Sequence, residues 1–384
     1  MSTKTQTQQT IIIDNGSDSI KAGLGGKDKP DLMVPTVVRK ETNTEKNEYY
    51  IGEKHETMNK LLDSIYPIER ETITHWEEME MIWSYVLNNL NQNNSLCNIF
   101  FPENVCESKA SRERKCQIMF ETFGVPSIGL GFQPILSLYS VNRTCGVVLD
   151  LGHSLSSACF VQNANIDPNS IQYINLGGKD ITDYLFQLIN KKYNGNYFLQ
   201  KCDWDIVEEL KKEICFVESN YTNTRNQNND KKAINSNNQN IKIKLSNNKE
   251  IEISNGRTKA IEILFNPNLV SLEDEPSISY LIKNSFNNCE FLNKDKILNS
   301  IFITGGSSKF SGLVDRLDYE LKHILNQNNI KTFSPKDSTI SSWVGANKFI
   351  TYNSPQNSWY TLEYYNENGL YDIHKKFYQK FYRM

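Results

Sequence analysis

A short apolar strand that ends in an aspartate and runs into a tight glycine turn occurs twice in this chain. The first copy covers residues 11–17 (IIIDNGS) and the second covers residues 146–154 (GVVLDLGHS). Each predicts a strand followed by a turn, and Asn15-Gly16 is a strong hairpin signal. A third strand-to-glycine turn covers residues 301–308 (IFITGGSS). Two copies of one pattern indicate a duplicated α/β lobe. The length of 384 residues is too great for one simple core, so we expect two lobes or domains.

Segments with helical spacing of their apolar residues alternate with these strands. They cover residues 76–90, 109–123, 180–192, 205–217 and 311–325. This alternation predicts an α/β fold. Two polar stretches interrupt it. We expect residues 40–54 to form a mobile loop and the Asn-rich residues 219–240 to form a solvated insertion, with a recognition role as the alternative.

The composition is that of a folded chain without an extreme of charge. The formal net charge is −3, so bulk charge does not indicate a nucleic-acid or membrane partner. The eight cysteines show no paired spacing of the kind that binds zinc, and scattered thiols are typical of reduced, intracellular proteins. We find no apolar leader and no apolar run of membrane-spanning length, so we expect a soluble protein of the cytoplasm or nucleus.

The aspartate–glycine turns carry the residue types of a phosphate and metal site. Gly16 lets backbone N–H groups approach phosphate oxygens, Ser17 adds a hydroxyl donor, and Lys21 adds a point charge. Asp14 and Asp150 are expected to hold Mg²⁺ through its waters, because Mg²⁺ keeps several of them. Since Asp-Asn-Gly also occurs in ordinary hairpins, the inference depends on the second copy and on the third glycine turn.

A Walker-type phosphate loop is absent from the sequence, because GxxxxGK[ST] occurs nowhere in it. The run Gly177-Gly178-Lys179 resembles a phosphate loop only superficially. Asp180 and Thr182, which follow it, are better interpreted as capping residues of a helix.

Several segments resemble, in order, the signature segments of the actin family. They are DNGSDSIKAGLGG (14–26), YPIERETITHWEEMEMIW (66–83), SRERKCQIMFETFGVPS (111–127), ILSLYSVNRTCGVVLDLG (135–152), LGGKDITDYL (176–185), ITGGSSKFSG (303–312) and SSWVGANKF (341–349). Sugar kinases and heat-shock chaperone ATPases share the fold but not these segments. The resemblance covers nearly the whole chain apart from the two polar stretches. It implies a divergent actin-related or actin-like protein.

The resemblance implies the actin-like ATPase fold, in which two duplicated α/β lobes flank a nucleotide cleft. The first lobe is expected to comprise residues 1–140 and 340–384, with an insertion at about 36–65 that corresponds to subdomain 2. The second is expected to comprise residues 141–339, with a subdomain-4-like insertion at about 177–273 that contains the Asn-rich stretch.

The resemblance also implies ATP or ADP with Mg²⁺ as ligands and assigns roles to residues. Asp14 and Asp150 match the aspartates that hold the metal through water, and Gln133 matches the glutamine that orients the attacking water. Lys211 matches a lysine near the adenine, and Asp180 is expected on the ribose side of the cleft. The remaining matches, in the loops that contact the nucleotide, are Asn15, Gly16, Ser17, Lys21, Gly152, His153, Gly305, Gly306 and Ser307.

The second turn departs from the family's pattern. His153 stands where the family has an aspartate, and Ser157 stands where it has a histidine that positions the lytic water. We interpret His153 as filling the cleft or facing solvent, with a ligand or base as the alternative. The base-contacting positions also differ, at Lys212, Lys309 and Thr339. These changes predict ATP binding with slow or absent hydrolysis, so at most a weak ATPase.

The surfaces that form filaments in the family differ as well. The 40–54 stretch lacks an apolar tip, and the groove used by many actin binders carries Phe349, Tyr352, Pro355 and Ser358. We therefore expect a structural or regulatory subunit of a cytoskeletal, multiprotein assembly in the cytoplasm. Its partners would be other protein subunits, among them actin or other actin-related proteins, with no membrane and no direct nucleic-acid contact.

Three alternatives remain open. They are a divergent polymerising actin with ATPase activity, a nuclear actin-related subunit of a chromatin-remodelling complex, and a small-molecule kinase of the same superfold, for which no general base is evident. The basic and aromatic residues 373–384 fit a terminal helix folded on its own lobe, or a segment that docks on a partner or on nucleic acid.

Overall fold

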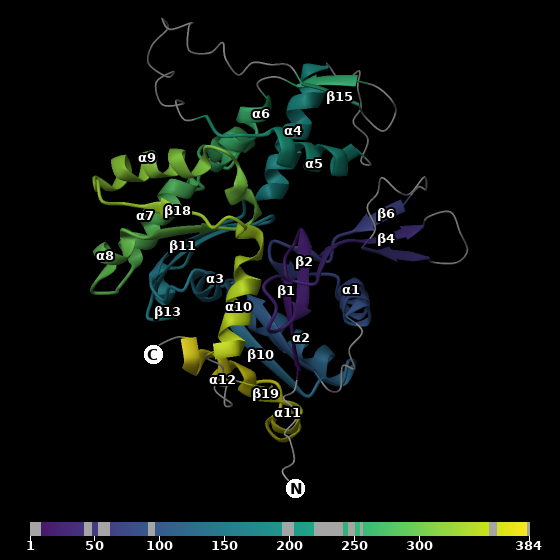
Figure 1. Cartoon of the computed structure of the whole chain (residues 1–384). Helices are drawn as coiled ribbons and strands as arrows, with labels where there is room; N and C mark the ends of the chain where they lie inside the picture. Colours follow the sequence, from purple (N-terminus) through teal and green to yellow (C-terminus); the bar gives the residue numbers. More distant parts are fainter. Residues whose placement is uncertain are drawn as a thin grey trace, which may run out of the picture.

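The computed structural model describes residues 9–41, 48–52, 62–90, 97–193, 203–218, 241–244, 250–253, 256–352 and 359–381. Strands and helices alternate along these residues and gather into two lobes, each built on its own mixed sheet (Figure 1). The predicted α/β class is confirmed. Within the described part of the chain, no helix has the length and apolar character that crossing a bilayer requires.

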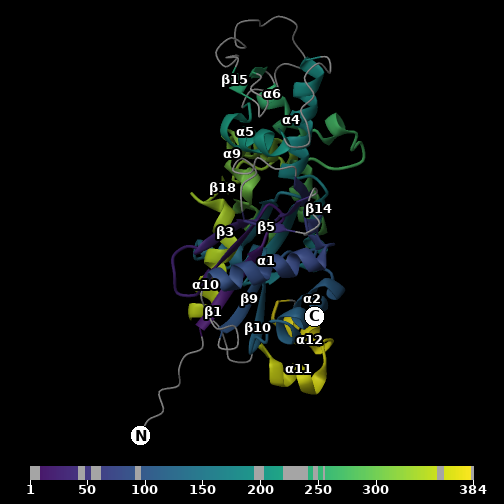
Figure 2. The ribbon, with the colours of Figure 1, turned by 90° about the vertical axis from the view of Figure 1, so that its right-hand side faces the viewer.

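The sheet of the first lobe has six strands in the order β19-β10-β9-β1-β2-β3. Strands β1 to β3 form an antiparallel meander, and β9 and β10 continue the sheet in parallel with β1. Ile11 and Ile13 pack with residues of α1 on one face, and α1 crosses in front of this sheet in Figure 2. The bounds are β1 Gln9–Asn15, β2 Ser19–Leu24, β3 Leu32–Pro35, α1 Trp76–Asn89, β9 Cys97–Glu103, α2 Lys109–Glu121, β10 Ser127–Phe132 and β19 Tyr360–Thr361.

The sheet of the second lobe has the order β13-β12-β11-β17-β18, and β14 also pairs with β12. Its core is a separate apolar cluster that includes Leu149, Leu151, Ile301 and Ile303. The bounds are β11 Gly146–Leu151, β12 Ser156–Gln162, β13 Asn165–Ile166, β14 Gln172–Ile174, α4 Gly178–Lys192, α5 Trp204–Ile214, α6 Gly256–Lys259, α7 Ile278–Asn288, α8 Lys294–Leu298, β17 Ile301–Thr304, α9 Leu313–Leu325 and β18 Thr332–Phe333.

The two sheets repeat one arrangement around their aspartates. In the first hairpin Asp14 pairs with Lys21, and in the second Asp150 pairs with Ser157. Each aspartate strand also has a parallel neighbour, β9 for β1 and β17 for β11. The duplicated lobe predicted from the repeated pattern is therefore present, with the two aspartates in equivalent places.

Smaller elements extend from the two lobes. A three-stranded sheet in the order β5-β4-β6 and the hairpin β7–β8 belong to the first lobe, and the hairpin β15–β16 belongs to the second. Their bounds are β4 Val38–Glu41, β5 Tyr49–Ile51, β6 Leu62–Ile65, β7 Ile68–Glu69, β8 Thr72–Ile73, β15 Ile241–Lys244 and β16 Glu250–Ile253.

Helices α3 (Gln133–Ser140) and α10 (Ser341–Tyr352) pack closely against each other between the lobes (Figure 1). A Cβ atom added at Gly345 would lie 1.6 Å from the carbonyl oxygen of Leu136, so only glycine allows this approach. Because α3 connects β10 directly to β11, this contact holds the junction of the two lobes.

The predicted helices are confirmed as α1, α2, α4, α5 and α9, with ends that differ by a few residues. The hairpin at Asn15-Gly16 is confirmed too. Its loop is longer than two residues, because Asn15 pairs with Ile20, and neither Asn15 nor Gly16 has the positive φ of a tight two-residue turn. The loop expected over residues 40–54 is wrong at residues 40–41 and 49–51, which belong to the paired strands β4 and β5. Residues 42–47 and 53–54 of that stretch lie outside the described residues. The Asn-rich residues 219–240 lie outside the described residues.

The C-terminal segment folds back on the first lobe. After α11 (Leu362–Asn368), helix α12 (Asp372–Phe381) buries Ile373 and Phe377, and the Phe377 ring lies 4.7 Å from that of Phe132. The interpretation of a terminal helix on its own lobe is confirmed for these residues. Phe349, expected in an outer groove, is instead buried beside Phe100, while Pro355 and Ser358 lie outside the described residues.

Candidate functional site: a cleft between the lobes

A cavity of about 590 Å³ lies between the two lobes. Its wall combines the turn after β1, the turn after β11, the start of α4, one face of α5 and the glycine loop after β17. It contacts most of the residues predicted from the sequence, namely Asp14, Gly16, Ser17, Lys21, Gln133, Asp150, Gly152, His153, Lys211, Gly305, Gly306 and Ser307.

Two predicted residues do not line this cavity. The side-chain oxygen of Asn15 accepts a hydrogen bond from the indole N–H of Trp83 at 3.1 Å, so it points into the first lobe. The carboxylate of Asp180 accepts hydrogen bonds from Arg70 and from the backbone N–H of Gly177, and its expected place on the ribose side stays a prediction. The capping role expected for Asp180 at the start of α4 is confirmed.

The carboxylate of Asp14 is held at both oxygens. The Gln133 amide donates to Oδ1 at 2.9 Å, and the Ser342 hydroxyl donates to Oδ2 at 2.6 Å. Gln133 is the first residue of α3 and Ser342 the second of α10, so the helix pair at the lobe junction orients the first aspartate. On the neighbouring strand the Lys21 ammonium donates to the Ser19 carbonyl oxygen at 3.0 Å.

Buried carboxyl groups gather at one end of the cavity. Burial and the charge of Asp14 raise the pKa of Asp150 to about 6, although Lys21 acts in the opposite direction. Burial also raises the pKa of Glu71 to about 7, and the Ser17 hydroxyl, which donates to its Oε1 at 3.0 Å, partly offsets this. A divalent cation would favour the charged forms of such carboxyls, so the oxygen donors present fit Mg²⁺.

Glycines shape the loops at this end of the cavity. A Cβ atom on Gly16 would lie 2.7 Å from the Ser19 carbonyl oxygen, and one on Gly152 would lie 2.8 Å from that of Leu155. The two hairpins therefore need glycine for the same reason. Gly305 has a φ of 86°, a left-handed conformation that favours glycine. Short glycine loops of this kind leave little side-chain bulk in the cavity.

Lys211 on α5 is fixed by the start of α4. Its ammonium donates to the Gly178 carbonyl oxygen at 2.8 Å and to the Thr182 hydroxyl at 2.9 Å. Burial lowers its pKa, and the charge of Glu208 partly restores it. The lysine therefore has a set position on the wall that the second lobe contributes to the cavity.

His153 fills part of the cleft, as the preferred interpretation expected. Its side chain is 13% exposed, and its Nδ1 lies 3.4 Å from Glu208 Oε1 and 3.9 Å from Asp18 Oδ1. Burial lowers the pKa of His153 to about 4 despite the opposing charge of Asp18. Ser157, the other departure, is buried in β12 and does not line the cavity.

Sequence reasoning missed Glu71, Asp18 and Glu208, although all three line the cavity. Glu71 and Asp18 lie inside segments that resemble the family, yet nothing in a single sequence separates them from other acidic residues. Glu208 lies one helical turn before Lys211 on α5, and this i, i+3 spacing was the available signal.

Ion pairs between the lobes close the rim of the cleft. Arg70, between β7 and β8, donates to both carboxylate oxygens of Asp180 at 2.8 and 2.9 Å. Arg39 on β4 donates to Asp205 on α5 at 3.0 Å. Both arginines belong to the first lobe and both acids to the second, so these pairs favour a closed arrangement.

Comparisons with known proteins agree with this architecture. The family model described as Actin matches residues 5–378. A protein of Neurospora crassa named actin-like protein is 30% identical over 380 residues, which covers 96% of this chain and 97% of that protein. The matched region contains both lobes and the whole cleft, so the fold is the actin-like ATPase fold. The chain belongs to the actin family.

Proposed function

We propose that this chain binds Mg-ATP or Mg-ADP in the cavity between its lobes. The observation that carries the proposal is the convergence of Asp14, Asp150 and Lys21 at one end of a cavity of about 590 Å³. A volume of this size is within the range of small-molecule sites. When bound, Mg²⁺ would neutralise phosphate charge and complement the buried carboxyl groups.

Each part of the wall has a role in this proposal. Asp14 and Asp150 would hold Mg²⁺ through its waters, and the Lys21 ammonium would pair with phosphate oxygens. The Ser17 hydroxyl, which now donates to Glu71, would add a donor to the phosphate oxygens. Gly305, Gly306 and Ser307 would contact the adenosine, with Lys211 near the base. Asp180 would reach the ribose only after releasing Arg70, which binds its carboxylate.

Nucleotide binding is tested by titrating the full chain with a fluorescent ATP analogue, with Mg²⁺ and with a chelator. We expect saturable binding that Mg²⁺ strengthens, and a rise in melting temperature with Mg-ATP because the ligand binds only the folded state. Absence of both effects at millimolar nucleotide would refute the proposal.

We infer slow or absent hydrolysis from Gln133 and Ser157, the two residues at positions that orient the attacking water in the family. The Gln133 amide donates to Asp14, and Ser157 is buried against the Asp150 strand. Ser157 thus offers no imidazole that orients or deprotonates water, and the Gln133 amide is engaged with Asp14. In a single-turnover assay we expect phosphate release to be slower than from conventional actin measured in parallel. An equal rate would overturn this part of the proposal.

We further propose that the chain acts as a subunit of a cytoskeletal, multiprotein assembly in the cytoplasm. The polar 40–54 sequence offers no apolar knob to a following subunit, whereas burial of apolar surface contributes roughly 25 cal/mol per Å². We expect no sedimenting polymer with Mg-ATP, and co-purification with actin or other actin-related proteins. Polymer formation would instead favour a divergent filament-forming actin, and recovery with nuclear remodelling subunits would favour the nuclear alternative.

A further inference from the structure

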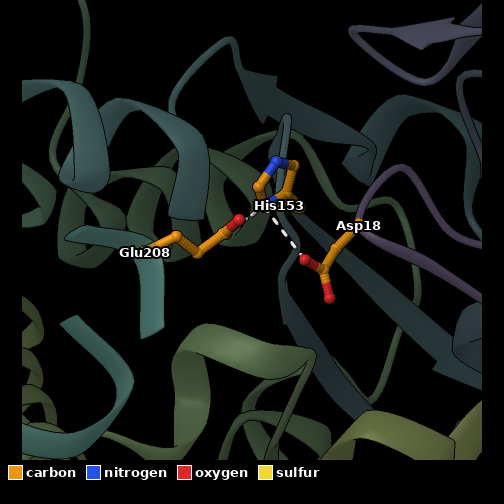
Figure 3. A group of neighbouring side chains, drawn as sticks. All are labelled: Asp18, His153 and Glu208. Carbon is orange, nitrogen blue, oxygen red and sulfur yellow. Dashed lines mark ion pairs between the residues drawn. The ribbon is translucent and has the colours of Figure 1, made fainter. Parts of the chain in front are cut away.

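Asp18, His153 and Glu208 meet across the two lobes on the wall of the main cavity (Figure 3). Asp18 lies in the turn between β1 and β2 of the first lobe. His153 follows β11 and Glu208 lies on α5, both in the second lobe. One donor atom from each side chain lies within 4.8 Å of the others.

We propose that these three side chains form a zinc site that joins the two lobes. Zinc binds imidazole nitrogen and carboxylate oxygen at about 2.0–2.2 Å, and a tetrahedral arrangement then separates its ligand atoms by about 3.4 Å. The imidazole Nδ1 of His153 lies 3.4 Å from Glu208 and 3.9 Å from Asp18. The third separation, between the carboxylates of Asp18 and Glu208, is within 4.8 Å. Side-chain movements of up to about 1.4 Å, the difference between that bound and the tetrahedral separation, would complete the geometry.

The three donor atoms are free of close competing contacts. In the part of the chain that the structure describes, no polar contact of His153 Nδ1, Asp18 Oδ1 or Glu208 Oε1 is shorter than 3.4 Å. Burial also keeps the His153 imidazole neutral at neutral pH, which is the form that binds a metal.

Two lysines lie beside the cluster, but neither forms a tight ion pair with it. Lys211 is 3.4 Å from Glu208, and it is already held at shorter distances by Gly178 and Thr182. Lys212 is 3.7 Å from Asp18 and 3.3 Å from Glu209, and its side chain is 45% exposed. Lys212 can therefore turn towards Glu209 and solvent when a cation binds.

The chemistry of the cluster separates it from the magnesium site. Mg²⁺ prefers oxygen ligands, whereas an imidazole with two carboxylates suits zinc. The cluster also lines both the main cavity and a second cavity of about 180 Å³. Open space on both sides leaves room for a water as the fourth ligand, as in zinc sites with three protein ligands.

A metal at this place would act on the cleft directly. Because Asp18 moves with the first lobe and the other two ligands with the second, zinc binding requires the closed arrangement. It would therefore stabilise closure together with the pair of Arg70 and Asp180. The site does not depend on nucleotide binding, so each of the two proposals can fail without the other.

The test uses the nucleotide-free full chain titrated with zinc chloride in a calorimeter. We expect one zinc per chain and a higher melting temperature. Loss of a residue that only supports a metal ligand weakens metal binding by up to about 100-fold. His153→Gln and Glu208→Gln remove proposed ligands themselves, so we expect each to weaken zinc binding by at least about 100-fold. The matched controls His75→Gln and Glu273→Gln, both at exposed positions away from the cluster, should bind zinc as the natural chain does.

Thiols are the competing zinc ligands, because the described cysteines are free. The cobalt(II) complex separates the two kinds of site, since thiolate ligands give strong near-ultraviolet charge-transfer bands and nitrogen and oxygen ligands do not. The metal-free melting temperatures of the variants report whether they fold. Thiolate bands, absence of stoichiometric binding, or equal zinc affinity in folded His153→Gln and Glu208→Gln chains would each overturn the proposal.

Discussion

Arg70 of the first lobe donates two hydrogen bonds to the carboxylate of Asp180, at the start of α4 in the second lobe. The same guanidinium donates to the Ser154 carbonyl oxygen at 2.6 Å. Arg70 has a φ of 46°, which is uncommon for a residue other than glycine. The turn between β7 and β8 thus has a strained backbone at Arg70, the residue whose side chain reaches the other lobe.

Loss of this pair should let the cleft open more often. For Arg70→Lys, which keeps the charge but loses the planar fork, we expect a fluorescent ATP analogue to dissociate a few-fold faster. The effect is modest because Arg70 is 43% exposed and such pairs contribute up to about 1 kcal/mol. Stopped-flow dissociation measures it, with Arg114→Lys on the outer face of α2 as the control. Equal rates in all three chains would mean that the pair does not govern opening.

Asp14→Asn tests the proposed metal site with little change of shape. The amide can still accept from Gln133 and can donate to Ser342, so the fold should be kept. We expect nucleotide affinity in Mg²⁺ to fall by at least about tenfold, which corresponds to about 1.4 kcal/mol. The affinity in chelator should change far less.

The control for this substitution is Asp28→Asn, at an exposed position of the first lobe. It should bind Mg-nucleotide as the natural chain does. If Asp14→Asn also left the affinity for Mg-nucleotide unchanged, Asp14 would not hold Mg²⁺ through its waters.

Local patterns in the sequence were enough to predict both hairpins and the residues on them. A strand that ends in aspartate and a glycine turn is specified by residues within a few positions of each other, so Asp14 and Asp150 can be matched to each other from the sequence alone. The equivalence of the two lobes then brings their turns to the same cleft.

Contacts between the lobes were not predictable in this way. Nothing near Arg70 in the sequence indicates that it binds Asp180, and the resemblance to the family placed Asp180 on the ribose side of the cleft. The meeting of Asp18 with Glu208 depends likewise on how the two lobes close. Such pairs depend on how the two lobes meet, a long-range arrangement whose geometry no local pattern contains.

Glu71 should make the nucleotide-free protein less stable as the pH rises. Its pKa is raised from an ordinary value of 4.5 to about 7, so the folded state binds the proton more tightly than the unfolded chain. The resulting stabilisation is fully present below pH 4.5, is lost as the pH rises to about 7, and changes little above that.

The substitution Glu71→Gln isolates this contribution, because the amide stays neutral at every pH. We compare the free energy of unfolding of the variant with that of the natural chain at pH 5 and at pH 8, from denaturant titrations. From pH 5 to pH 8 the natural chain should lose on the order of 3 kcal/mol more than the variant does. The neighbouring exposed Glu69→Gln should show no such change. A pH dependence that Glu71→Gln leaves intact would place its origin in other groups.

The C-terminal helix α12 should be required for the stability of the first lobe. Phe377 is 5% exposed, packs on Phe132 at 4.7 Å between ring centroids, and lies under the Arg112 guanidinium at 4.6 Å. Arg112 in turn forms a buried ion pair with Glu103 at 2.8 Å. Removal of the Phe377 ring would therefore leave a cavity beside a buried charge.

For Phe377→Ala we expect the free energy of unfolding to fall by about 3 kcal/mol, the lower part of the range for a buried phenylalanine, because α12 lies near the end of the chain. Urea denaturation at fixed pH measures this loss. Tyr371→Ala, at a side chain that is 64% exposed, should change the stability by less than about 0.5 kcal/mol. Equal effects of the two substitutions would mean that α12 detaches in solution, and the basic, aromatic tail would then be available to a partner.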